Sequence, residues 1–67
     1  MRSYRVNLNL LDNAIFKEYR MIQRFFDIDE AELFKERFSD IRIKITHDCA
    51  SAEELLECAE LIKLHND

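Results

Sequence analysis

The chain contains neither glycine nor proline in its 67 residues, although average usage predicts about eight residues of the two types together. Glycine-rich phosphate loops and nucleophile elbows need positive φ angles or very close backbone approach, which glycine permits at the least cost. The common loop-based catalytic and nucleotide-binding motifs are therefore excluded. Any chemistry of this chain has to lie on the faces of its secondary-structure elements.

Long apolar runs and a cysteine framework are also missing. The sequence has neither a run of 18 apolar residues nor a signal-peptide pattern, so we expect a cytoplasmic protein without membrane association. The two cysteines, Cys49 and Cys58, allow at most one disulfide. His47 and His65 add zinc-ligand types, but neither Cys-x-x-Cys nor His-x-x-x-His spacing occurs. We expect no metal and no cofactor.

The length predicts one domain, residues 1–67, with little stability of its own. A domain of this size buries only about 60% of the surface that its unfolded chain exposes. With no disulfide framework, self-association is the remaining means of stabilisation. We therefore expect a homodimer.

Charge is divided along the chain. Residues 1–26 carry five basic and two acidic side chains, a net charge of +3, whereas residues 27–67 carry five basic and twelve acidic ones, a net charge of −7. This asymmetry indicates either a surface for a charged partner or two parts of one fold that attract each other.

Two segments alternate between apolar and polar residues, which is the period of a half-buried strand. Residues 4–10 alternate from Tyr4 to Leu10, and residues 41–46 alternate from Ile41 to Thr46 with three β-branched isoleucines. The pattern predicts strands over 4–10 and 41–46.

Helix signals fill the remaining segments. Asp12, Asp29 and Ser51 are suitable N-caps and predict helices over 13–26, 30–38 and 52–64. The first of these has a main apolar stripe, formed by Ile15, Tyr19, Ile22 and Phe26, and a second apolar line, so more than one of its faces needs cover. That second line consists of Ala14, Met21 and Phe25.

The predicted order β-α-α-β-α gives an α+β fold of two layers, with helices on one face of a two-stranded sheet. A sheet of two strands is thin for independent stability. We expect dimerisation to extend it, and addition of a strand to a partner's sheet is the alternative.

The polar face of this sheet would present Arg5, Asn7, Asn9, Arg42 and Lys44, which are side chains that pair with bases or neutralise phosphates. Residues 5–10, followed by a capped helix, are similar to the opening of ribbon-helix-helix repressors. In that family the polar residues of a paired N-terminal strand read DNA. The resemblance covers about residues 4–38 and implies a DNA-reading role for Arg5, Asn7 and Asn9.

The third predicted helix offers a different surface. Its core face is predicted to hold Leu56 and Cys58. Leu61 and Leu64 fall on the opposite side among carboxylates, which suggests a docking site for a basic, apolar partner surface. The residues of this predicted protein-binding site are Glu53, Glu57, Glu60, Leu61 and Leu64.

No catalytic arrangement accompanies these surfaces, because the carboxylates lie on a solvated helix face where nothing raises a pKa. We therefore expect a small non-enzymatic protein-binding factor that occupies a surface on a larger protein, of the accessory or inhibitory type found in phages and mobile elements. The alternative is a DNA-binding transcriptional regulator of ribbon-helix-helix type.

Overall fold

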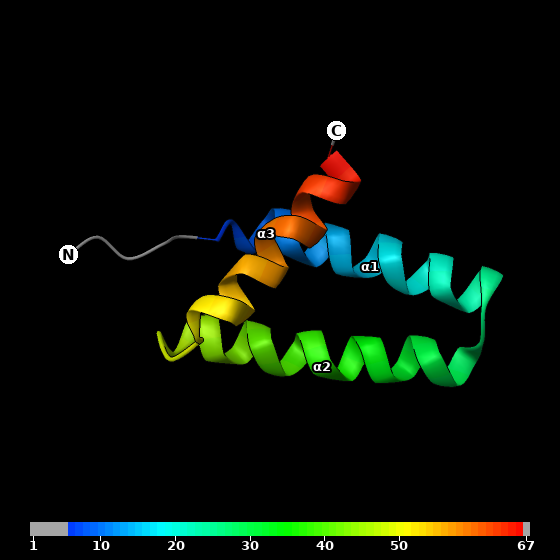
Figure 1. Ribbon diagram of the computed structural model, residues 1–67, viewed down its shortest axis with the longest axis horizontal. Helices are drawn as coiled ribbons and strands as arrows, with labels where there is room; N and C mark the ends of the chain where they lie inside the picture. The colour runs from blue at the N-terminus through cyan, green and yellow to red at the C-terminus, as the bar shows by residue number, and fades with distance from the viewer. Residues whose placement is uncertain (1–5, 67) are drawn as a thin grey trace.

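The computed structural model describes residues 6–66, which form three α-helices (Figure 1). α1 spans Leu8–Phe25, α2 spans Ile28–Thr46 and α3 spans Ala52–Asn66. α1 and α2 form an antiparallel hairpin, and α3 crosses the half of it that contains the start of α1 and the end of α2. The predicted α+β fold is wrong, since residues 6–66 contain no strand and the domain is all-α.

The predicted strand 41–46 is the last part of α2, which continues through Ser39 and Asp40 without a break. Its inward positions follow helical spacing, with Phe38 and Ile41 buried and Ile45 packed against the core. Ile43 fits only the alternating pattern, and its side chain is 55% exposed. Packing at a period of 3.6 residues therefore outweighs the β propensity of the isoleucines.

The predicted strand 4–10 fails for the same reason. Leu8 and Leu11 lie at helical spacing against the core, whereas Leu10, which fits only the alternation, is more exposed. Asn7 begins the helix, because its side-chain oxygen accepts hydrogen bonds from the backbone amides of Asn9 at 3.0 Å and Leu10 at 3.1 Å. Residues 4 and 5 of the predicted strand lie outside the described residues.

Two of the three predicted caps are displaced. Asp12 lies within α1, and Asp27 rather than Asp29 caps α2 by accepting from the Asp29 amide at 3.0 Å. The third cap is confirmed: Ser51 and Glu54 form a reciprocal capping box at the start of α3, with distances of 2.9 and 3.1 Å.

The core lies where α3 crosses the hairpin. All three helices contribute to it, and Cys58 of α3 is fully buried at its centre, as its position in the sequence predicted. Its buried members are Leu11, Ala14, Phe38, Ile41, Cys58 and Leu61. Within the part of the chain that the structure describes, no helix is both long and apolar enough to span a membrane.

Candidate protein-binding surface

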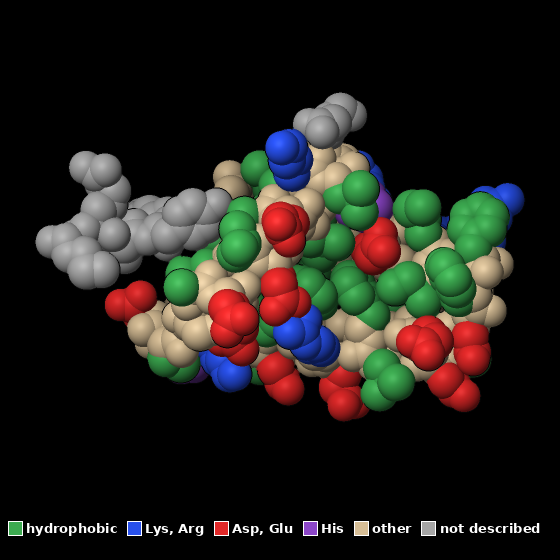
Figure 2. Space-filling model, viewed as in Figure 1, with side chains coloured by type: hydrophobic (Ala, Val, Ile, Leu, Met, Phe, Trp, Pro, Cys, Tyr) green, Lys and Arg blue, Asp and Glu red, His purple; other side chains and the backbone are tan. Residues whose placement is uncertain are grey.

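The face of the hairpin that α3 covers continues, uncovered, towards the loop between α1 and α2. Two contacts mark the edge of α3: His65 Nε2 lies 2.8 Å from Glu18 Oε1 of α1, and Glu57 pairs with Arg37 of α2. Positions three or four apart share a helix face. On the faces of α1 and α2 that α3 covers, the positions beyond this edge are occupied by apolar residues. Figure 2 shows hydrophobic side chains extending from beneath α3 to the loop end of the hairpin.

We call this region the open face. It consists of Met21, Ile22, Phe25, Phe26 and Leu33. Phe25 is 67% exposed, Phe26 79% and Leu33 64%. Single exposed apolar side chains are ordinary, but a contiguous apolar patch on a small protein marks a binding site.

A hollow of about 410 Å³ forms part of the open face, lined by Ile22, Phe26, Asp27 and Glu30. The turn between the helices creates it. The backbone amides of Phe26 and Asp27 both donate to the carbonyl oxygen of Ile22, at 2.9 and 3.1 Å, which ends α1 and leaves the Phe26 ring at the tip of the hairpin. The Asp27 cap then starts α2 immediately. A loop this short leaves no chain to cover the two phenylalanines.

The open face has one basic and one acidic edge. The outer side of α1 carries Lys17, Arg20 and Arg24, and the Arg24 guanidinium lies 5.6 Å from the centre of the Phe25 ring. The start of α2 carries Asp29 and Glu30. This arrangement suits a partner that is apolar at its centre and charged at its margin.

The structure separates the residues predicted as an acidic docking site on α3. The expectation that Leu61 is exposed is wrong, because only 9% of it is accessible, whereas Leu64 is 65% exposed. Leu56, predicted in the core, is 58% exposed. The outer face of α3 therefore presents Leu56 and Leu64, with Glu53 and Glu60 exposed on the same helix.

Glu57 takes part in a contact within the domain. It accepts two hydrogen bonds from the Arg37 guanidinium, one of them from Nη2 at 2.8 Å. These bonds lower the pKa of the Glu57 carboxyl and raise that of Arg37. This pair fastens α3 to α2, so Glu57 has a structural contact rather than a free carboxylate.

The residues predicted to read nucleic acid do not share a strand. Arg42 pairs with Asp12 of α1 at 2.6 Å, and Lys44 pairs with Glu54 of α3 at 2.9 Å, so the two cations point towards different helices. Asn7 is a helix cap, and Asn9 is exposed in the first turn of α1. Arg5 lies outside the described residues. The strand on which the ribbon-helix-helix interpretation depends is absent from residues 6–66.

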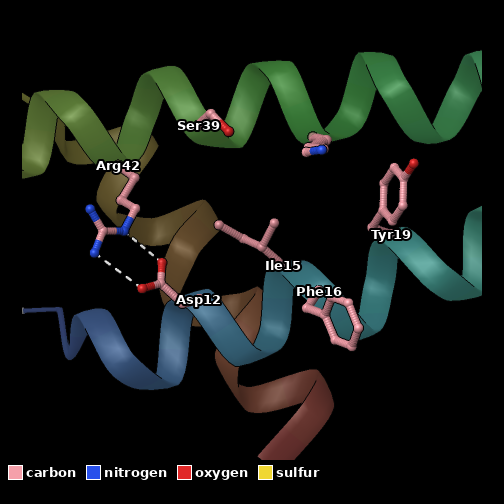
Figure 3. A pocket seen from close by; sticks show the side chains of 7 residues that line it. Asp12, Ile15, Phe16, Tyr19, Ser39 and Arg42 are labelled. Carbon is pink, nitrogen blue, oxygen red and sulfur yellow. Dashed lines mark hydrogen bonds and ion pairs between the residues drawn. The ribbon is translucent and has the colours of Figure 1, made fainter.

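A second hollow, of about 290 Å³, lies on the other face of the hairpin, with α3 behind it (Figure 3). Ile15, Phe16 and Tyr19 of α1 line one side, and Ser39 and Arg42 of α2 line the other. The Tyr19 hydroxyl donates to Glu32 at 2.5 Å, and this hydrogen bond raises the pKa of Tyr19. With Arg42 held by Asp12, the polar groups of this hollow mainly join the two helices.

Neither cysteine is part of a larger constellation. Cys49 is exposed after α2, and Cys58 is buried, which raises the pKa of its thiol to about 11. No group of three His, Cys, Asp or Glu side chains within residues 6–66 is arranged to hold a metal ion.

One signal in the sequence pointed to the open face. The second apolar line of the first helix, Ala14, Met21 and Phe25, predicted that a further surface would pack against this side of the helix. In the structure Ala14 is buried in the core to which α3 contributes, whereas Met21 is 49% and Phe25 67% exposed. The exposure of Phe26 and Leu33 depends on where α3 crosses, which no local pattern specifies.

These features define a small three-helix protein with a half-covered hairpin. The chain belongs to the RIIA.1-like protein family, whose model matches residues 1–67. It is 64% identical over 63 residues, 94% of each chain, to a protein of Enterobacteria phage T4 described as an uncharacterized 8.1 kDa protein in the rIIA-Gp60 intergenic region. No solved structure matches the chain.

Proposed function

We propose that this chain is a non-enzymatic phage protein that acts inside the infected cell by binding a larger protein through its open face. The observation that carries the proposal is the exposure of Phe25 and Phe26, which are 67% and 79% accessible beside a hollow at the tip of the hairpin. Aromatic side chains are enriched in the energetically dominant centres of protein interfaces. The similarity to a phage T4 protein supports the phage context.

The open face has the anatomy of such a centre. Its apolar middle is flanked by Arg24 on one side and Glu30 on the other, and charged margins of this kind orient a partner more than they add affinity. A larger protein that offers an apolar ridge would cover Phe25, Phe26 and the hollow together. An accessory or inhibitory role follows if that ridge is needed by the target's other partners.

Capture from infected cells tests the proposal. A tagged protein would be expressed in enterobacterial cells during infection with phage T4, and co-purifying proteins would be quantified by mass spectrometry. Phe26→Ser should lose a specific target that the unmodified protein retains, because truncating a central aromatic residue costs at least about tenfold in affinity.

Phe16→Ser is the matched control, since Phe16 is also exposed, at 57%, but lines the hollow on the opposite face. It should keep the target. A target retained equally by both variants, with both folded by circular dichroism, contradicts the assignment to the open face.

A further inference from the structure

The open face and the outer face of α3 lie side by side on the same side of the molecule (Figure 2). α3 stands on one half of the hairpin, and the other half, which carries Phe26 and Leu33, is recessed beside it. The molecule thus has a step, with a raised helix next to a hollowed apolar surface. A shape of this kind is complementary to a second copy turned by 180° about an axis through the step.

We infer that two copies of this chain form a symmetric dimer in which α3 of each copy packs its outer face on the open face of the other. In such an arrangement α3 of the first copy lies on the open face of the second, and α3 of the second copy lies on the open face of the first. The two contacts are identical because a two-fold axis relates the copies. The inference concerns the purified protein alone and does not depend on the identity of a larger target.

The two patches match in polarity. Leu56 and Leu64 on the outer face of α3 are 58% and 65% exposed, and the open face offers Phe25 and Phe26 at 67% and 79%. Each patch alone is an apolar surface without cover among the described residues. The proposed contact covers the leucines of α3 and the phenylalanines of the open face together. A contact of hairpin with hairpin, or of α3 with α3, would cover only one of the two patches.

The two patches also match in charge. Glu53 and Glu60 accompany the leucines of α3, and the outer edge of α1 beside the open face carries Lys17, Arg20 and Arg24. None of these five side chains takes part in an ion pair within residues 6–66. The contact therefore brings an acidic helix against a basic edge, as the opposite charges of the two halves of the chain suggest.

The accessible area of the chain, the length of α3 and the small size of the core all favour a dimer. A standard interface buries about 800 Å² per partner, a modest part of the 5329 Å² that is accessible here. A helix of 15 residues is about 22 Å long, long enough to lie across both helices of a hairpin. The buried core of the single copy contains an alanine and a cysteine among its few members, so additional burial is valuable at this chain length.

The test is sedimentation equilibrium of the purified protein at micromolar concentrations, where a dimer is expected. Phe26→Ser and Leu64→Ser should each raise the dissociation constant about tenfold or more, because each removes an apolar anchor from one side of the contact. Phe16→Ser on the opposite face of the hairpin should leave it unchanged.

A charge exchange identifies the pairing. Arg24→Glu alone and Glu60→Lys alone should each weaken the dimer, because each places like charges at both symmetric contacts. An equimolar mixture of the two variants should recover dimerisation, since each contact then contains one acidic and one basic partner. A monomer under all conditions, or a dimer indifferent to both changes, overturns the inference.

The outcomes for the two proposals are separable. The sedimentation experiment contains no target, and the capture experiment needs no dimer. If both hold, the second copy and the target compete for the open face, and a dimer made permanent by cross-linking should release the target.

Discussion

The guanidinium of Arg42 in α2 holds the carboxylate of Asp12 in α1 through two contacts, Nε to Oδ1 at 2.6 Å and Nη2 to Oδ2 at 3.1 Å (Figure 3). The two residues are thirty positions apart in sequence. Their pairing joins the start of α1 to the end of α2, at the end of the hairpin remote from the loop. The hydrogen bonds to Asp12 and the charge of Asp12 raise the pKa of Arg42, whose guanidinium stays protonated in proteins in any case.

We expect Asp12→Asn to lower the melting temperature at low salt and to lose most of this effect at high salt. The pair is partly exposed, at 39% for Arg42 and 47% for Asp12, so mobile ions screen it. Thermal unfolding followed by circular dichroism at several salt concentrations measures the difference. Glu36→Gln, on an exposed position of α2, is the control and should shift the melting temperature little at any salt concentration.

Leu61 and Leu64 should respond very differently to truncation. Leu61→Ala removes a buried side chain and should lower the free energy of unfolding by about 2–4 kcal/mol, whereas Leu64→Ala changes a side chain that is 65% exposed. Urea denaturation at a protein concentration below the onset of self-association compares them. Equal effects of the two substitutions would contradict the burial of Leu61.

Asp48→Gly should stabilise the protein. Asp48 has φ of 57°, in the left-handed region, at the end of α2. There the Cys49 amide donates to the carbonyl of Lys44 at 2.8 Å and the Asp48 amide donates to that of Ile45 at 3.0 Å, a Schellman motif that usually contains glycine. The gain should be about 0.5–1 kcal/mol, because the cost of about 1–2 kcal/mol for a side chain in the left-handed region is removed and is partly offset by the greater chain entropy that glycine loses on folding.

The control for this substitution is Asp40→Gly, within α2, which should instead destabilise the protein by a few tenths of a kcal/mol, because glycine is slightly less favourable than aspartate inside a helix. Chemical denaturation of both variants beside the parent decides the matter. A destabilising Asp48→Gly would mean that the turn does not hold this conformation in solution.

Acid should weaken the attachment of α3. The pKa of Glu57 is lowered by its hydrogen bonds from Arg37, and that of Glu54 by the Ser51 amide and by Lys44. The unfolded chain binds protons at these carboxyls at a higher pH than the folded one. Their contribution to stability is therefore complete above the ordinary glutamate pKa of about 4.3 and is lost as the pH falls below it.

Urea midpoints measured from neutral pH down to acid give this profile. Glu57→Gln should flatten the acid limb, while Glu53→Gln, at an exposed position of the same helix, should preserve it. An unchanged profile in Glu57→Gln would show that the pair with Arg37 contributes nothing to acid sensitivity.

Local sequence signals predicted α3 well and α2 poorly, for a physical reason. The start of α3 is fixed by Ser51 and Glu54, which lie three positions apart in sequence, and the side chain of each accepts a hydrogen bond from the backbone amide of the other. In α2, the alternation of Ile41, Ile43 and Ile45 is compatible with two structures. Burial of Ile41 against the other helices selects the helical one, and that burial is a tertiary property.

The candidate site was only partly predictable for the same reason. The sequence placed Leu64 on an exposed acidic helix, which the structure bears out, but placed Leu61 beside it, because the wheel of an isolated helix does not reveal how its neighbours approach. Phe26 was assigned to the buried stripe of the first helix. Its exposure follows from the end of α1 at Phe25 and from the coverage of α3, neither of which alternation or capping signals specify.

The crossing position of α3 has a consequence for motion. Amides near Leu11 and Ile41 belong to the part of the hairpin where all three helices pack together. Those near Ile22 and Glu30 belong to the loop end of the hairpin, which α3 does not cover. Local opening requires less free energy where fewer apolar contacts are lost. Hydrogen exchange should therefore run faster at the loop end, and a molecule that covers this end should slow it. Binding of a partner to the open face would then be detected as a loss of local flexibility in the hairpin.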